Sequence, residues 1–176
     1  MHKSIDLRTS NVYHHIRYTF LLCGAFMDNT CCFFGHRNIF ESVDSSVYEK
    51  ICNLIETQNI STFIVGDYGD FDKVTAAMVR KAKKKYNNVK LILVRPYFSN
   101  ELNTNKDYYA MLYDDIIIPD ELSDVHFKNA IRKRNEWMID NSQYVIFYVR
   151  RNYGGAYTAL RYAQNRSKNF CNIADK

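Results

Sequence analysis

Short apolar runs alternate along the chain with segments in which apolar residues recur every three to four positions. The runs predict buried β-strands at residues 30–34, 61–66, 89–94 and 143–149, and shorter ones at 115–119 and 168–173. The spaced segments predict helices over residues 42–58, 72–86, 123–142 and 156–166. Strands that are apolar throughout and alternate with helices are typical of a parallel sheet covered on both faces.

We therefore predict an α/β fold, with a single doubly wound Rossmann-like domain and a mainly parallel sheet flanked by helices over residues 29–176. Residues 99–115 are expected to form a long irregular connection, and Ser123 or Asp124 to cap the helix that follows. Residues 1–28 are an N-terminal extension of unassigned role, which could add a helix or a strand to the domain. Its apolar run is too short to span a membrane.

The composition adds an uneven charge distribution to this picture. The chain has 176 residues, 47% of them hydrophobic, which suits one folded domain with a sizeable core. The net charge is +5, and residues 128–168 carry nine Lys or Arg against two acidic residues. This basic half favours an anionic ligand such as a nucleotide phosphate, although a solvated surface explains most of these charges as well. We do not expect nucleic acid as a partner, because the basic residues form no recognisable nucleic-acid motif.

The five cysteines show no paired spacing and no zinc pattern. We therefore expect a cytoplasmic protein without structural disulfides, without a metal site and without a membrane partner. Cys31 and Cys32 fall in a predicted strand, where cysteine behaves as a small hydrophobe.

Five of the six glycines follow predicted strands: Gly35, Gly66, Gly69, Gly154 and Gly155. In a parallel α/β sheet, ligands bind at the carboxyl ends of the strands. Glycine at these ends permits tight turns and lets a ligand approach the free N–H groups of a helix. A simple strand-to-helix turn explains each glycine alone, but their concentration predicts a binding site.

Gly154 and Gly155 precede a helix whose first turn contains Thr158. Free N–H groups, a hydroxyl and the positive helix end together predict a seat for an anion. His36 and Arg37 follow the first strand, where the forked guanidinium of Arg37 suits phosphate. A lone histidine such as His36 is more often structural than catalytic.

The loop with Gly66 and Gly69 leads into the second predicted helix. Asp72, near the start of that helix, either caps it or accepts hydrogen bonds from ribose hydroxyls. The spacing of the two glycines matches neither the dinucleotide fingerprint nor a P-loop.

The segments CCFFGHRNI, GDYGDFDKVTAAMV, VKLILVRPY, AIRKRNEWMIDNSQYVIFYV and GGAYTALRYA, in this order, resemble the SLOG superfamily, and in particular its short, stand-alone bacterial and phage members. The resemblance covers about residues 30–173. The superfamily includes the DNA-processing protein DprA and the Lonely Guy phosphoribohydrolases. The resemblance implies a Rossmann-like fold and a nucleotide ligand, either NAD- or ADP-ribose-like or a nucleoside monophosphate.

The Lonely Guy enzymes carry an R-K-x-x-M helix followed by P-G-G-x-G-T-x-x-E. Arg134 and Met138 resemble the first motif, and Gly154, Gly155 and Thr158 resemble the second. The resemblance therefore implies a retained phosphate site, with Arg37 or Arg134 as counter-charge.

Arg161 stands where those enzymes have their catalytic glutamate. A guanidinium can neither accept a proton nor supply negative charge to an oxocarbenium-like transition state. Only Glu136 or Asp72 is a candidate to replace the missing carboxylate.

Three functions follow, in order of preference. The first is binding of a small-molecule nucleotide, for sensing or sequestration; the second is hydrolysis of a nucleotide N-glycosidic bond; the third is a DprA-like association with DNA. The 14 tyrosines are compatible with a homodimer, or they complete the edge of the core.

Overall fold

The computed structural model describes residues 18–19 and 29–174. Seven strands form one sheet in the order β1-β5-β4-β3-β2-β6-β7, and all neighbouring pairs are parallel. The strands are β1 (Tyr18–Thr19), β2 (Thr30–Gly35), β3 (Thr62–Val65), β4 (Lys90–Val94), β5 (Asp115–Ile117), β6 (Tyr144–Tyr148) and β7 (Asn169–Asn172). The predicted doubly wound parallel fold is confirmed.

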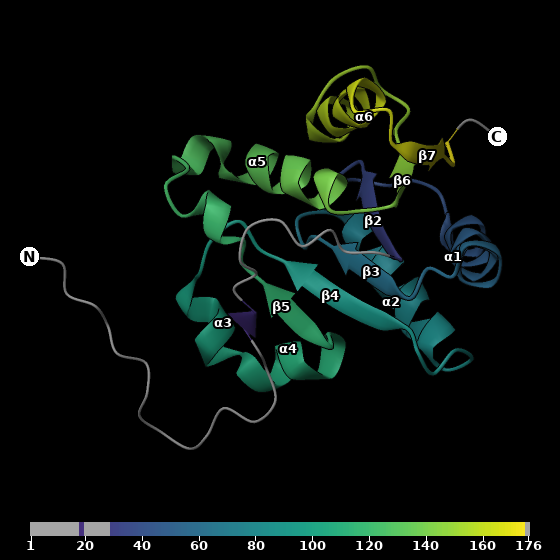
Figure 1. Ribbon diagram of the computed structural model, residues 1–176, viewed down its shortest axis with the longest axis horizontal. Helices are drawn as coiled ribbons and strands as arrows, with labels where there is room; N and C mark the ends of the chain where they lie inside the picture. The colour runs from purple at the N-terminus through teal and green to yellow at the C-terminus, as the bar shows by residue number, and fades with distance from the viewer. Residues whose placement is uncertain (1–17, 20–28, 175–176) are drawn as a thin grey trace, which may run out of the picture.

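Helices cover both faces of the sheet (Figure 1). They are α1 (Asp44–Gln58), α2 (Asp70–Lys83), α3 (Asn100–Thr104), α4 (Lys106–Leu112), α5 (Phe127–Asp140) and α6 (Gly155–Asn165), with a 3-10 turn η1 (Asp120–Leu122). Helices α5 and α6 lie on one face, and α1 to α4 lie on the other (Figure 1).

Two local predictions were wrong. The segment 99–115 contains the short helices α3 and α4, because Leu102 and Tyr109 are buried against Leu93 and Ile116 of the sheet. Helix α5 begins later than predicted, because η1 and a turn occupy residues 120–125. Its N-cap is His126, whose ring nitrogen Nδ1 accepts a hydrogen bond from Lys128 N at 3.3 Å, and not Ser123 or Asp124.

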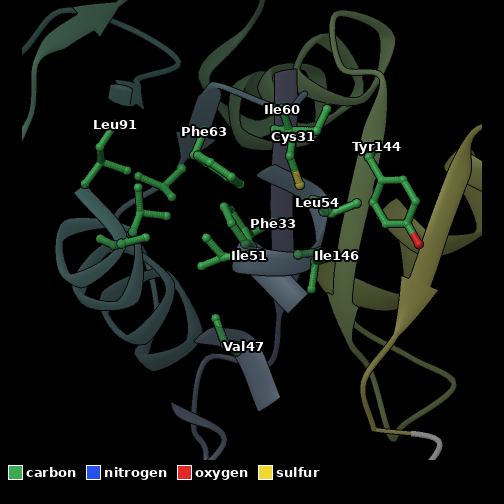
Figure 2. Close-up of a cluster of buried hydrophobic side chains, with 14 of the residues drawn as sticks. Cys31, Phe33, Val47, Ile51, Leu54, Ile60, Phe63, Leu91, Tyr144 and Ile146 are labelled. Carbon is green, nitrogen blue, oxygen red and sulfur yellow. The ribbon is translucent and has the colours of Figure 1, made fainter. Parts of the chain in front are cut away.

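Alternation along β2 builds two cores at once. Cys31 and Phe33 face α1 and α2, whereas Cys32 and Phe34 face α5 and α6. Figure 2 shows the first cluster, in which Phe33 stacks on Phe63 with a centroid distance of 5.9 Å. Burial raises the pKa of Cys32 to about 12 and also raises that of Cys31, so both thiols stay neutral, as packing residues do.

The strand order places a topological switch point between β2 and β6. Strands β3, β4 and β5 extend the sheet on one side of β2, and β6 and β7 extend it on the other side. Crevices form at the carboxyl ends of strands where the winding direction changes in this way. Strand β2 ends at Gly35, and the loop after β6 leads to Gly154 and Gly155. The fold therefore brings two of the predicted glycine loops together.

Part of the N-terminal extension belongs to the sheet. Tyr18 and Thr19 pair with Ile116 and Ile117 of β5 as an added edge strand. The remainder of residues 1–28 lies outside the described residues.

Substitution Gly35→Ala is expected to lower the free energy of unfolding by about 1–3 kcal/mol, because overpacking forces buried groups apart. A Cβ on Gly35 would lie 2.3 Å from Cγ of Phe71, which is buried and stacked on Tyr148. Urea unfolding measures the change, and Gly155→Ala is the matched control, since a Cβ there has no atom within 4 Å. Equal stabilities of the two variants would contradict this account of the close contact.

Candidate functional site

A cavity of about 300 Å³ opens at the carboxyl ends of β2, β3 and β6. Every glycine of the described residues lines it, and so do four of the other predicted binding residues: His36, Arg37, Asp72 and Arg134. The structure therefore brings together nine of the ten residues that the sequence suggested. The tenth, Thr158, lines a neighbouring groove between α5 and α6.

Arg134 forms the floor of this cavity. Its side chain extends from α5, is only 3% exposed, and donates a hydrogen bond from Nη1 to the carbonyl oxygen of Val94 at 3.0 Å. The absence of a side chain at Gly66 makes room for it, since a Cβ there would lie 2.4 Å from Arg134 Nη1 and 2.9 Å from Asp72 Oδ2. Gly66 thus leaves room for both the guanidinium and the carboxylate below the site.

Burial controls the charges of this pair. It raises the pKa of Asp72, while the positive charge of Arg134 and a hydrogen bond from Tyr68 N at 3.0 Å oppose the shift. Burial also lowers the pKa of Arg134, which Asp72 opposes. The Nε of Arg134 has no hydrogen-bond partner among the described residues. Both groups are therefore poorly solvated, and the hydrogen bonding of the buried guanidinium is incomplete.

The loop between β3 and α2 is held from two sides. Arg37 donates from Nε to the carbonyl oxygen of Tyr68 at 3.1 Å, and Asp70 N donates to the carbonyl oxygen of Arg37 at 2.8 Å. Behind the loop, Arg95 forms an ion pair with Asp67. The guanidinium carbons of Arg134 and Arg95 lie 5.4 and 5.9 Å from the centroid of the Tyr68 ring. This wall of the cavity is consequently fixed before any ligand arrives.

The opposite wall is the N-terminus of α6. Gly154 has a φ of 87°, a conformation that favours glycine, and this residue turns the chain from the β6 loop into the helix. The first helical bond runs from Thr158 N to the carbonyl oxygen of Gly154 at 3.0 Å. The N–H groups of residues 155–157 precede that bond and are available to an anion.

The Thr158 hydroxyl is used within the helix. Its Oγ1 donates to the carbonyl oxygen of Gly154 at 3.1 Å. In this structure Thr158 supports the turn instead of lining the cavity.

His36 organises the loop that precedes Gly154. Its Nε2 accepts hydrogen bonds from Arg150 N at 2.9 Å and from Arg151 N at 3.2 Å, which places the ring proton on Nδ1. Burial and the charge of Arg151 lower the pKa of His36. The neutral ring therefore acts as a structural acceptor beneath the loop.

The cavity also has residues that were not among the ten predicted binding residues, including Tyr68, Ile131, Asn135, Arg151 and Tyr153. Asn135 is notable because its buried Oδ1 has no partner among the described residues. Ile131 lies three residues before Arg134 on α5, so helical spacing would have indicated that both residues are on the helix face toward the cavity. No sequence signal marks Tyr68 as a cavity residue.

Glu136, one of the two candidate carboxylates, lines the groove between α5 and α6 and not the cavity. It forms ion pairs of 2.7 Å with both Arg132 and Lys133. Partial burial raises its pKa, but the bonds to Lys133 and Arg132 outweigh this effect and hold the pKa below its usual value. Asp72 is thus the candidate that faces the cavity.

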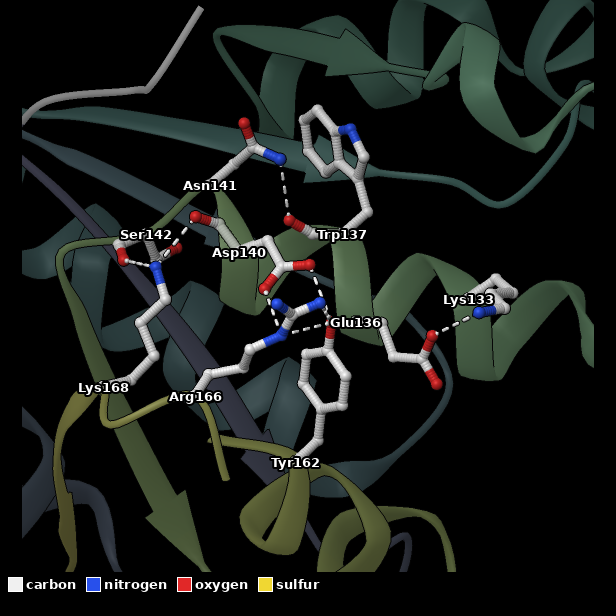
Figure 3. Close-up of polar contacts among 9 residues, drawn as sticks. All are labelled: Lys133, Glu136, Trp137, Asp140, Asn141, Ser142, Tyr162, Arg166 and Lys168. Atoms are coloured by element: carbon white, nitrogen blue, oxygen red, sulfur yellow. Dashed lines mark hydrogen bonds and ion pairs between the residues drawn. The ribbon is translucent and has the colours of Figure 1, made fainter. Parts of the chain in front are cut away.

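A group of polar contacts at the far ends of α5 and α6 fixes the spacing of the two helices (Figure 3). Tyr162 donates to Asp140 at 2.7 Å, and Arg166 lies 3.5 Å from the same carboxylate. Lys168 donates to the carbonyl oxygens of Asp140 and Ser142 at 2.8 and 3.0 Å. Because Arg134 lies in the middle of α5 and Gly155 begins α6, contacts that fix the spacing of these helices help to set the width of the cavity.

The sequence matches one known family over most of its length. The profile of the YspA SLOG family covers residues 28–173. The chain belongs to the YspA SLOG family. This confirms the resemblance to SLOG proteins that the sequence motifs carried. A search of curated proteins found no match for the sequence.

Two solved structures share the fold of this YspA SLOG protein. DNA processing protein A from Helicobacter pylori, described for its single-stranded DNA binding mode, is 19% identical with a TM-score of 0.56, over 80% of this chain and 63% of that one. DprA from Streptococcus pneumoniae is 15% identical with a TM-score of 0.58, over 80% of this chain and 48% of that one. The chain thus spans about half to two thirds of the length of these proteins.

Two further properties concern metals and membranes. Within residues 18–19 and 29–174, His, Cys, Asp and Glu side chains form no group of three or more that could hold a metal ion. None of the described helices combines the length and the apolar character that a bilayer crossing requires.

The lowered pKa of His36 predicts a pH-dependent loss of stability. Its folded pKa lies below the unfolded value of about 6.5, so its contribution is present above that pH and is lost as the pH falls through the folded pKa. We expect the wild type to lose more stability between pH 7 and pH 5 than His36→Gln, which retains an acceptor but cannot titrate. Urea unfolding over this range tests the difference, and superimposable profiles would contradict it.

Proposed function

We propose that this YspA SLOG protein binds a nucleotide or nucleotide-derived small molecule, with a phosphate at the N-terminus of α6. The observation that carries the proposal is the convergence of free helix N–H groups and the buried, incompletely bonded Arg134 on one cavity. Family membership and the likeness to DNA-processing proteins support a nucleotide- or DNA-associated role in general. A cavity of about 300 Å³ favours a small ligand over a polymer.

The charges of the cavity suit this ligand. Arg37, Arg134 and Arg151 line it, against the single carboxylate of Asp72. A phosphate beside residues 155–157 would gain the helix dipole, backbone donors and this excess of positive charge. The arrangement recognises an anion through the backbone and places its charge toward the cationic floor.

Asp72 supplies the complementary acceptor. Its Oδ2 is already bonded to Tyr68 N, and its carboxylate lines the cavity opposite the helix end. A carboxylate accepts hydrogen bonds from hydroxyl groups, as a ribose would offer. We therefore assign the ribose side of the ligand to Asp72 and the phosphate side to α6.

Substitution Gly155→Asp is expected to weaken binding of nucleotides about tenfold or more, because it places a like charge beside the phosphate. Isothermal titration against a panel of nucleoside monophosphates, ADP-ribose and NAD measures the effect. The fold should tolerate the change, since a Cβ on Gly155 has no neighbour within 4 Å.

The matched control is Gly155→Ala, which adds a methyl group without charge. We expect its affinity to stay within about threefold of the wild type, because the backbone donors remain. If Gly155→Asp and the wild type bound nucleotides equally well, the phosphate would not lie at the N-terminus of α6. If the wild type bound no member of the panel, the whole proposal would be overturned.

A second candidate function is hydrolysis of a nucleotide N-glycosidic bond. The specific observation in its favour is the raised pKa of Asp72 within the cavity, beside Arg134. A carboxyl with a raised pKa suits proton transfer near neutral pH, and its charged form stabilises an oxocarbenium-like centre. Asp72 would then take the role of the catalytic glutamate of the Lonely Guy enzymes, which Arg161 replaces in this sequence, although Arg161 itself lines the groove between α5 and α6.

For this activity, Asp72→Asn is expected to reduce release of free base from AMP or NAD by about 100-fold or more. Glu136→Gln is the matched control and should retain the activity, since Glu136 lies outside the cavity. Chromatography of the products measures the rates. Intact substrate after prolonged incubation with concentrated wild-type protein would dismiss the hydrolase.

A further inference from the structure

A second chamber of about 210 Å³ adjoins the cavity. The two share His36, Asn38 and Arg151 in their walls, so they meet across the segment that His36 holds in place. The first chamber alone is at the lower limit of the volumes that ligand sites usually have. The neighbouring space therefore extends the site toward Phe40.

The two adjacent arginines of the β6 loop serve different chambers. Arg151 lines both chambers, whereas Arg150 lines only the second. Both backbone N–H groups bond to the same ring nitrogen of His36, which fixes where the two side chains leave the loop.

The charge of Arg150 is balanced within the second chamber. Its Nη2 lies 2.6 Å from Glu41 Oε1, and the Tyr148 hydroxyl donates to the same oxygen at 2.7 Å. Glu41 thus offsets the guanidinium of Arg150, and the other guanidinium of this chamber is that of Arg151, which the two chambers share. Beyond the shared Arg151, the part of the second chamber around Arg150 and Glu41 is charge-balanced and favours an uncharged group with hydrogen-bonding capacity over another phosphate.

Phe40 gives this chamber an open aromatic face. Its side chain is 86% exposed, although it lines a concave surface. An exposed ring beside a nucleotide site offers the flat apolar surface on which a base stacks.

We infer that the two chambers form one site for a dinucleotide, a ligand whose phosphates carry a second nucleoside. This inference rests on the proposed function, since it requires a phosphate at α6. In this arrangement the phosphates lie between the N-terminus of α6 and Arg151. One nucleoside occupies the first chamber, beside Arg134 and Asp72, and the base of the other nucleoside stacks on Phe40 in the second chamber. Glu41 and Arg150 provide an acceptor and donors for its polar edge.

Isothermal titration of the full chain with AMP, GMP, diadenosine diphosphate and diguanosine diphosphate tests the inference. The dinucleotides carry the same nucleoside at both ends, so either orientation fills both chambers. We expect a dinucleotide to bind about tenfold more tightly than its mononucleotide, and Phe40→Ala to abolish this difference while leaving mononucleotide affinity within twofold.

Phe127→Ala is the matched control, because Phe127 is 70% exposed but lines neither chamber, and Phe40→Trp should preserve the preference for dinucleotides. Equal affinities for mononucleotides and dinucleotides, unchanged by Phe40→Ala, would overturn the second chamber while leaving the proposed function intact. Absence of binding to these four probes and to every member of the panel above would overturn both.

Discussion

The buried guanidinium of Arg134 is the contact on which the cavity depends. A cation that is removed from water costs several kcal/mol unless its surroundings compensate. Here the compensation comes from three parts of the chain: the carbonyl oxygen of Val94 at the end of β4, the carboxylate of Asp72 on α2, and the face of Tyr68. The absence of a side chain at Gly66 leaves space for the guanidinium in this position. The Arg134 side chain therefore connects α5, on one face of the sheet, with the end of β4 and with the loop between β3 and α2 below the cavity.

The protein compensates only in part for the burial of the Arg134 guanidinium. The proposed binding of a phosphate-bearing ligand is based on this shortfall. Arg134 Nε and Asn135 Oδ1 are buried without partners among the described residues, and arginines outnumber carboxylates around the cavity. A phosphate-bearing ligand would supply negative charge where the cavity has an excess of cations. The contacts at the distal ends of α5 and α6 oppose collapse of the gap, so the site is held open in advance.

The sequence predicted six of the seven strands, the long helices and many of the residues around the cavity, because apolar periodicity and strand-end glycines reflect local constraints. It did not predict α3 and α4, since helices of five and seven residues are too short to show a clear period. The role of Thr158 was inferred from a motif, but a motif does not fix the rotamer that directs its hydroxyl to Gly154. Phe40 and Glu41 carried no signal, because they become part of a site only when the β6 loop folds beside them.

The central claim is that a phosphate docks on the amides that begin α6. Amide chemical shifts recorded by NMR during a titration with AMP test it most directly, because hydrogen bonds to phosphate deshield the donor protons. The account predicts that the largest downfield shifts belong to residues 155–157, with the amides that begin α1 unchanged. Saturable binding that leaves residues 155–157 unshifted would contradict it.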